Sequence, residues 1–131
     1  MARYSRRGLN PDSLLVKAGT PGADYAQGLL KPTPGERTVI KFGYDAFQDT
    51  DLQALLKNRG IKSLVVTGVS TNLSVQATVL RAFAEGYYVV VPKDAVASTE
   101  VELHTYALAN FERFFALIPP AEDAIKVWSA K

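Results

Sequence analysis

The feature that most constrains this chain is a β-branched run that passes through a glycine into a helical pattern. Residues 65–78 read Val-Val-Thr-Gly-Val-Ser-Thr-Asn-Leu-Ser-Val-Gln-Ala-Thr. The β-branched start favours a strand, Gly68 favours a turn, and apolar residues at helical spacing follow Ser74. This order places Ser74 where the carboxyl end of a strand meets the amino end of a helix. Both ends are preferred sites for ligands and for developing negative charge.

Strand and helix patterns alternate around this turn. Short β-branched or apolar runs predict strands at residues 38–40, 64–66, 88–91 and 116–118. Apolar residues at helical spacing predict helices over residues 50–60 and 74–86, and further helices are predicted over residues 99–110 and 121–125. Two capping-box spacings mark helix starts, Thr50 with Gln53 and Thr99 with Glu102. The unbroken apolar run at 88–91 is typical of a strand buried on both faces. The alternation predicts an α/β fold with a mostly parallel sheet.

The chain length of 131 residues fits a single domain. Because proline and glycine punctuate residues 1–36, we predict an irregular segment there and an α/β domain over residues 37–131. The formal net charge of +2 gives no electrostatic reason to expect a nucleic-acid partner. No stretch reaches the roughly 20 apolar residues of a membrane helix, and the N-terminus lacks a signal-peptide core. We therefore expect no membrane partner and a cytoplasmic location.

Two residues could carry chemistry, and each has two interpretations. Ser74 either satisfies free N–H groups at a helix start or acts as a nucleophile with oxyanion donors nearby. Lys41 follows the strand predicted at 38–40, at the edge where parallel sheets bind ligands. It is either a solvated surface residue or, if partly desolvated, a group that tunes a nucleophile or moves protons. The absence of cysteine excludes disulfides, thiolate metal sites and thiol catalysis.

Four segments resemble the isochorismatase-like cysteine hydrolases. The lysine motif of that family is similar to residues 40–47, Ile-Lys-Phe-Gly-Tyr-Asp-Ala-Phe, followed by Thr-Asp-Leu at 50–52. Its nucleophile turn is similar to residues 67–78, and the strand and loop after it to residues 86–95. The loop that leads in resembles Gly-Thr-Pro-Gly-Ala at 19–23. The resemblance covers nearly the whole chain and weakens toward both ends.

This resemblance implies a Rossmann-like, open, mostly parallel sheet with flanking helices, and a triad of aspartate, lysine and cysteine. In amidase members the cysteine attacks a carbonyl carbon, whereas isochorismatase members hydrolyse a vinyl ether without it. Lys41 takes the lysine position and Ser74 the cysteine position. The Val69–Ser70 bond falls where members hold a non-proline cis peptide. The resemblance therefore implies that the N–H groups of Ser70 and Ser74 face an oxyanion.

The resemblance also implies a small-molecule substrate. The aromatic residues near Lys41 either line its pocket or pack in the core; they are Phe42, Tyr44 and Phe47. Nicotinamidase-like members bind a metal with an aspartate and two histidines, but this chain has one histidine, His104. We predict packing or an interface for His104, no metal site and no cofactor.

The chain departs from the family pattern at its beginning. The triad aspartate lies in the family's first strand, and that strand and the second have no counterpart here. None of Asp24, Asp45 and Asp94 occupies its position by motif. In the family those strands lie between the lysine strand and the nucleophile strand, so two unpaired edges are expected. A longer protein, another chain or a closing of the remaining strands could complete the sheet, and we predict a homo-oligomer.

The second departure is serine in place of the catalytic cysteine. A thiol forms a thiolate readily beside a lysine, whereas a serine hydroxyl needs a base within hydrogen-bond reach. A Ser–Lys dyad and an inactive paralogue both fit this change. We predict an isochorismatase-like hydrolase domain that acts on a small carbonyl compound at a C–N (amide) bond and is weak or inactive. The alternative is a non-catalytic pseudoenzyme that serves as a binding or assembly module.

Overall fold

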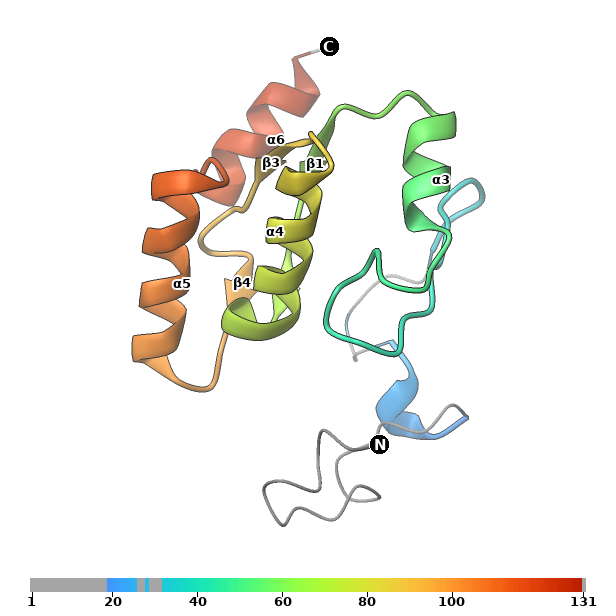
Figure 1. The fold of residues 1–131 in the computed structure, drawn as a ribbon, viewed down its shortest axis with the longest axis horizontal. Coiled ribbons are helices and arrows are strands. Elements are labelled where there is room, and N and C mark those ends of the chain that lie inside the picture. The colour runs from blue at the N-terminus through green and yellow to red at the C-terminus, as the bar shows by residue number, and fades with distance from the viewer. Residues whose placement is uncertain (1–18, 26–27, 29–31, 131) are drawn as a thin grey trace. The chain divides into compact units, whose positions relative to one another are not determined.

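The computed structural model describes residues 19–25, 28 and 32–130 (Figure 1). The chain forms two compact units, Met1–Thr38 and Val39–Lys131. In the described part of the first unit, Pro21–Ala23 form one 3₁₀ turn, and the hydroxyls of Tyr25 and Thr38 lie 3.0 Å apart. Most of the segment predicted to be irregular, residues 1–18 above all, lies outside the described residues.

The second unit is built on parallel strand pairs. Strand β1 (Ser63–Val65) pairs with β3 (Tyr88–Val90), with Leu64 opposite Val89. Strand β2 (Gly68–Val69) pairs with β4 (Val96–Ala97) in the same parallel sense. Beyond β3, Leu117 adds a parallel bridge to Val90. The predicted α/β fold with a parallel sheet is therefore confirmed.

Four helices accompany the strands of this unit in Figure 1: α3 (Leu52–Asn58), α4 (Gln76–Ala84), α5 (Val101–Phe114) and α6 (Ala121–Ser129). Helices α4 and α5 lie side by side over the strands, α6 lies behind them in this view, and α3 lies beyond β1. The edge-to-face rings of Phe83 and Phe115, with centroids 5.4 Å apart, join the end of α4 to the end of α5. No helix among the described residues is both long enough and apolar enough to cross a bilayer.

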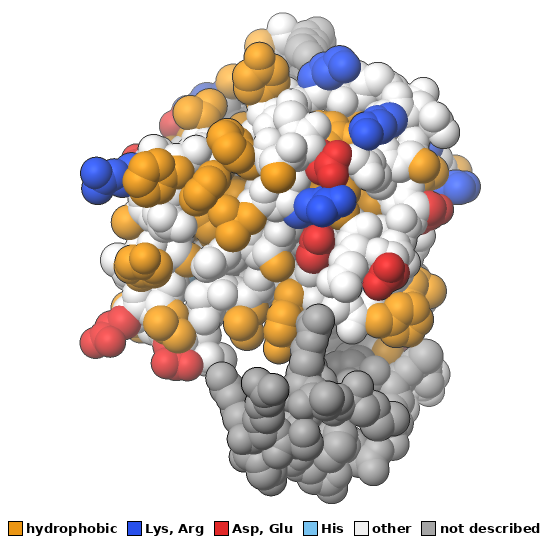
Figure 2. All heavy atoms as spheres, viewed as in Figure 1, with side chains coloured by type: hydrophobic (Ala, Val, Ile, Leu, Met, Phe, Trp, Pro, Cys, Tyr) orange, Lys and Arg blue, Asp and Glu red, His pale blue; other side chains and the backbone are white. Residues whose placement is uncertain are grey.

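The core lies between the strands and the pair α4 and α5. Val79 of α4, Val91 after β3 and Phe111 of α5 have no exposed surface. Their burial places the apolar stripe predicted for α4, and the buried face of α5, against the sheet. Outward from this core, Figure 2 shows hydrophobic side chains over α5. The exposed large hydrophobic residues of α5 are Val101, Leu103, Tyr106 and Phe114.

The strand predicted at 38–40 is wrong, because the structure assigns none there and Ile40 is 72% exposed. A β-branched segment forms a strand only when a neighbour completes its hydrogen-bond ladder, and none of the described residues does so. At 116–118 the predicted strand is reduced to the single bridge of Leu117. The predicted burial of 88–91 on both faces is also wrong, since Tyr88 is 76% exposed while Val89 is 4% exposed.

Helix boundaries differ from the predictions by a few residues. Helix α5 continues past Asn110 to Phe114, and α6 continues to Ser129. Neither capping box forms: the N-cap positions are Asp51 and Glu100, without side-chain cap bonds. Tertiary contacts extend α5 because its last turn carries the buried Phe111.

Candidate active site

The turn that carries Ser74 is a π-helical turn rather than the first turn of α4. It spans Thr71–Val75 and is continuous with α4. The carbonyl of Ser70 accepts hydrogen bonds from the N–H of Leu73 at 3.1 Å and of Val75 at 3.2 Å. Val75 is 3% exposed and packs in the core, so the base of the turn is fixed. Ser74 is half-buried on the other side of the turn.

The peptide bond between Val69 and Ser70 is cis, the geometry that the resemblance implies at this position. Val69 is exposed, and Ser70 is half-buried at the start of the turn.

Two side-chain links hold the turn from the far side. The Thr71 hydroxyl, fully buried, lies 2.8 Å from Nδ1 of His104 on α5. The Ser98 hydroxyl donates to Oδ1 of Asn72 at 2.7 Å. His104 is thus half-buried and joined to the turn by this hydrogen bond. The roles of Thr71, Asn72 and Ser98 were not predicted, because their partners lie 26 and 33 residues away in sequence.

Lys41 comes from a separate segment that is anchored by its neighbours. Phe47, 6% exposed, inserts into the core with its ring centroid 6.1 Å from that of Tyr87. The N–H of Ala46 donates to the Thr78 hydroxyl of α4 at 3.2 Å. Lys41 itself is exposed, and its ammonium donates to the Gly43 carbonyl at 2.7 Å. The core and α4 therefore position the loop, while the ammonium remains in contact with solvent.

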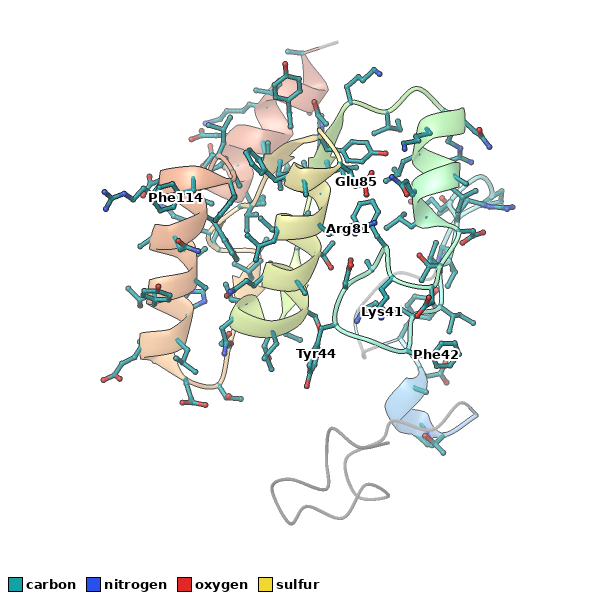
Figure 3. The ribbon with its side chains drawn as sticks, in the orientation of Figure 1. Lys41, Phe42, Tyr44, Arg81, Glu85 and Phe114 are labelled. Carbon is teal, nitrogen blue, oxygen red and sulfur yellow. The ribbon has the colours of Figure 1, made fainter. Side chains whose placement is uncertain are left out.

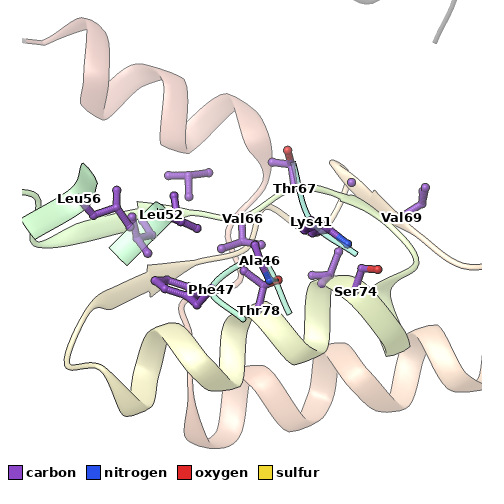
Figure 4. A pocket seen from close by; sticks show the side chains of 14 residues that line it. Lys41, Ala46, Phe47, Leu52, Leu56, Val66, Thr67, Val69, Ser74 and Thr78 are labelled. Carbon is purple, nitrogen blue, oxygen red and sulfur yellow. Dashed lines mark hydrogen bonds between the residues drawn. The ribbon is translucent and has the colours of Figure 1, made fainter. Parts of the chain in front are cut away.

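A cavity of about 440 Å³ brings Lys41 and Ser74 together (Figure 4). In the close-up both side chains lie toward the Val69 end of the cavity, away from Leu52 and Leu56 of α3. The lining is mostly apolar and comprises Lys41, Ala46, Phe47, Leu52, Leu56, residues 64–69, Ser74, Val75 and Thr78. A mostly apolar cavity with a few polar groups at one end is typical of a small-molecule site.

Of the three aromatic candidates, only Phe47 lines this cavity. Phe42 is 97% exposed and Tyr44 is 48% exposed, and neither belongs to the lining. Figure 3 shows both rings directed outward from the loop that carries Lys41. The structure thus brings Lys41, Ser74 and Phe47 together and leaves Phe42 and Tyr44 outside.

Two carboxylates in the second unit serve local structure. Oδ1 of Asp45 accepts from the N–H of Phe47 at 2.8 Å, and Oδ1 of Asp94 accepts from the N–H of Ala121 at 2.7 Å. Lys41 has no acidic partner within the described residues. The same part of the chain holds no cluster of histidine, aspartate and glutamate that could bind a metal.

Glu85 ties α3 to α4 beside the cavity. Its carboxylate accepts a hydrogen bond from the Gln53 side chain of α3 and lies 3.9 Å from the Lys57 ammonium. On α4 itself, Arg81 pairs with Glu85 at 2.9 Å (Figure 3). Since Gln53 reaches Glu85, it is not free to complete the predicted capping box with Thr50. This link holds the α3 wall of the cavity in place.

Comparison with known proteins places this chain in a family. A family model described as the Isochorismatase domain matches residues 4–123. Ureidoacrylate amidohydrolase RutB of Methylobacterium radiotolerans is 36% identical over 111 residues, which cover 83% of this chain. The chain spans 43% of the length of that relative.

Solved structures give the same result. An isochorismatase-like hydrolase from Alkaliphilus metalliredigens is similar with a TM-score of 0.83 and 34% identity, over 92% of this chain and 66% of that one. The nicotinamidase from Staphylococcus aureus is similar with a TM-score of 0.61 and 35% identity, over 62% of this chain and 51% of that one.

Proposed function

The chain belongs to the isochorismatase family of hydrolases, and from that premise we propose that Lys41 and Ser74 act on the C–N bond of a small amide. The observation that carries the proposal is the shared cavity: two segments far apart in sequence bring a hydroxyl and an ammonium to one end of it. Two of the similar proteins, a ureidoacrylate amidohydrolase and a nicotinamidase, are named for the hydrolysis of amides.

In this proposal the hydroxyl of Ser74 attacks the carbonyl carbon of the bound amide. The carbonyl oxygen becomes an oxyanion and accepts hydrogen bonds from the N–H groups of Ser70 and Ser74. The Lys41 ammonium donates a proton to the departing nitrogen, and the amine so formed takes up the hydroxyl proton of Ser74, so the C–N bond breaks and ammonia or an amine leaves. Water then attacks the acyl ester on Ser74 and releases a carboxylic acid.

The arrangement of Ser74 and Lys41 also limits the rate of hydrolysis that this proposal expects. No hydrogen bond within the described residues joins Ser74 to a base, and Lys41 is exposed and without an acidic partner. A serine hydroxyl that lacks a base is a weak nucleophile. These observations favour a second candidate, a module that binds small carbonyl compounds without turnover.

Ammonia release from nicotinamide and from ureidoacrylate separates the two candidates. Under the hydrolase proposal, Ser74→Cys raises the rate by at least about tenfold, because the thiol ionises much more readily than the hydroxyl. Ser74→Ala abolishes release. Ser129→Cys, which places a thiol on the exposed face of α6, is the matched control and leaves the rate unchanged.

The binding-module candidate predicts a different pattern. One of the two compounds binds saturably, while Ser74→Cys releases no ammonia from either. Absence of both binding and release in the parent chain and in Ser74→Cys contradicts both candidates.

A further inference from the structure

The cavity that holds Ser74 extends to the far end of β1. The N–H of Ile61 donates to the Leu56 carbonyl at 3.0 Å, so the last turn of α3 lies beside the start of β1. In Figure 4 the side chains of Leu52 and Leu56 lie at one end of the cavity, and those of Lys41 and Ser74 lie toward the other. A ligand that fills the cavity therefore contacts both ends.

The two ends differ in chemistry. Among the described residues that line the cavity, Lys41 alone carries a charge, and it lies toward the end with the candidate nucleophile. At the other end, α3 contributes Leu52 and Leu56, and neither has a polar side chain. Phe47 and Val66 lie between the two ends in the close-up and are apolar as well. The cavity therefore offers charge to one end of a ligand and apolar contact to the rest.

Two threonines also line the cavity without changing this division. The Thr78 hydroxyl already accepts the N–H of Ala46 at 3.2 Å, and Thr67 is exposed to solvent. Neither residue carries a charge. A charged group placed beside Leu52 and Leu56 would therefore lose part of its hydration without gaining a partner of opposite charge, which costs free energy.

An apolar group at the same place has the opposite effect. The side chains of Leu52, Leu56 and Leu64 are only partly buried in the chain by itself. A ligand that covers them removes their apolar surface, and its own, from water, which strengthens binding. Each methylene that lies along these side chains is expected to add affinity.

The position of Lys41 determines which part of an amide carries the tail. In the proposed reaction the ammonium of Lys41 meets the departing nitrogen. A tail on that nitrogen would cover the ammonium with apolar groups and remove its hydration. A tail on the acyl carbon avoids this cost and can extend toward α3.

We propose that this site takes uncharged primary amides with an unbranched aliphatic acyl tail, which lies along the apolar part of the cavity and ends beside Leu52 and Leu56. The inference rests on the proposed function, because it takes the cavity as the site of amide hydrolysis. It assigns the affinity for the tail to α3 and leaves the chemistry to Ser74 and Lys41.

A homologous series of amides tests the inference on the full chain with Ser74→Ala, which prevents turnover. Acetamide, butanamide and hexanamide are titrated, and chemical shifts of the backbone amides give each dissociation constant. We expect the dissociation constant to fall about threefold for each added methylene. Two matched ligands, N-butylacetamide and 6-amino-6-oxohexanoate, bind at least about tenfold more weakly than hexanamide.

A substitution in α3 locates the tail. Leu56→Gln places a polar group at the far end of the cavity, so it weakens hexanamide binding about fivefold and changes acetamide binding less than about twofold. Leu103→Gln, on the exposed face of α5, is the matched control and leaves both affinities unchanged. Far-ultraviolet circular dichroism reports whether each variant is folded. The ligand series does not depend on Leu56→Gln and holds even where that variant unfolds.

Three outcomes overturn the inference. They are absence of binding by every amide, equal affinity for acetamide and hexanamide, and an affinity for 6-amino-6-oxohexanoate that matches or exceeds that for hexanamide. In the last case Lys41, rather than α3, recognises the tail.

Ammonia release from the same amides, by the parent chain and by Ser74→Cys, separates this inference from the proposed hydrolysis. Binding that strengthens with tail length, without any release, supports the inference and contradicts the hydrolysis. Release at a rate that does not depend on tail length supports the hydrolysis and contradicts the inference.

Discussion

The two edges of the same small sheet are completed differently. Beyond β3, Leu117 exchanges backbone hydrogen bonds with Val89 and Val91 at 2.9 and 2.8 Å, and Lys93 donates to the Pro119 carbonyl at 3.0 Å. Beyond β1 no described residue pairs, and a cavity of about 440 Å³ follows the edge. The described residues therefore close one edge and provide no partner for the other, at the side that holds Lys41.

Some side chains show the same division, although Phe47 and Val75 on the cavity wall are also buried. Val91 and Phe111, on the closed side, have no exposed surface, whereas Leu56 and Leu64 at the open edge are only partly buried. Fully buried side chains contribute most to stability, so the closed side carries more of it. The open side carries the candidate chemistry, because a site needs surface that the chain has not already filled.

The largest effect is expected on the closed side. Phe111→Ala removes a fully buried ring and lowers the free energy of unfolding by about 3–5 kcal/mol, because a cavity remains. Urea denaturation measures this loss. The milder Phe111→Leu retains most of the volume and costs less than half as much. A loss below about 1 kcal/mol for the alanine variant would contradict the comparison.

Next in size is the link between the nucleophile turn and α5. Thr71→Val removes the hydroxyl that faces His104 and leaves Nδ1 of the ring without its partner, at a cost of about 1–3 kcal/mol. Chemical denaturation of Thr71→Val, His104→Leu and the double variant measures the coupling. Fully additive effects would show that the two groups do not interact.

A smaller effect is expected at the open edge. Leu56→Ala removes a partly buried side chain from the cavity wall and lowers the free energy of unfolding by about 1 kcal/mol. Urea denaturation beside Phe111→Ala compares the two sides directly. A loss equal to that of Phe111→Ala would remove the distinction between them.

The smallest effect concerns the attachment of α3. Glu85→Gln removes the charge that faces Lys57 and Arg81, and it changes global stability by less than about 1 kcal/mol. Amide hydrogen exchange in α3 should nevertheless accelerate, since this helix loses its link to α4. Glu122→Gln, which removes an exposed ion pair of α6, is the matched control and leaves exchange in α3 unchanged.

Local signals in the sequence determined the order of strands and helices and identified Lys41 and Ser74 as residues to examine. The β-branched runs at β1 and β3 and the apolar stripe of α4 are local patterns, and the structure confirms them. The resemblance to a known family implied the cis peptide bond between Val69 and Ser70, which the structure contains. Each of these features depends on residues that are near one another in the chain.

Only the tertiary structure decided which segments find partners. Residues 38–40 have the composition of a strand and form none, because no described neighbour completes their ladder. Thr71 meets His104, Gln53 meets Glu85, and Phe42 is left exposed although Phe47 is buried. These outcomes depend on groups more than 25 residues apart or on the space around a side chain, which local periodicity does not encode. A hydrogen-bond ladder and a filled core belong to several segments at once, so only their assembly determines them.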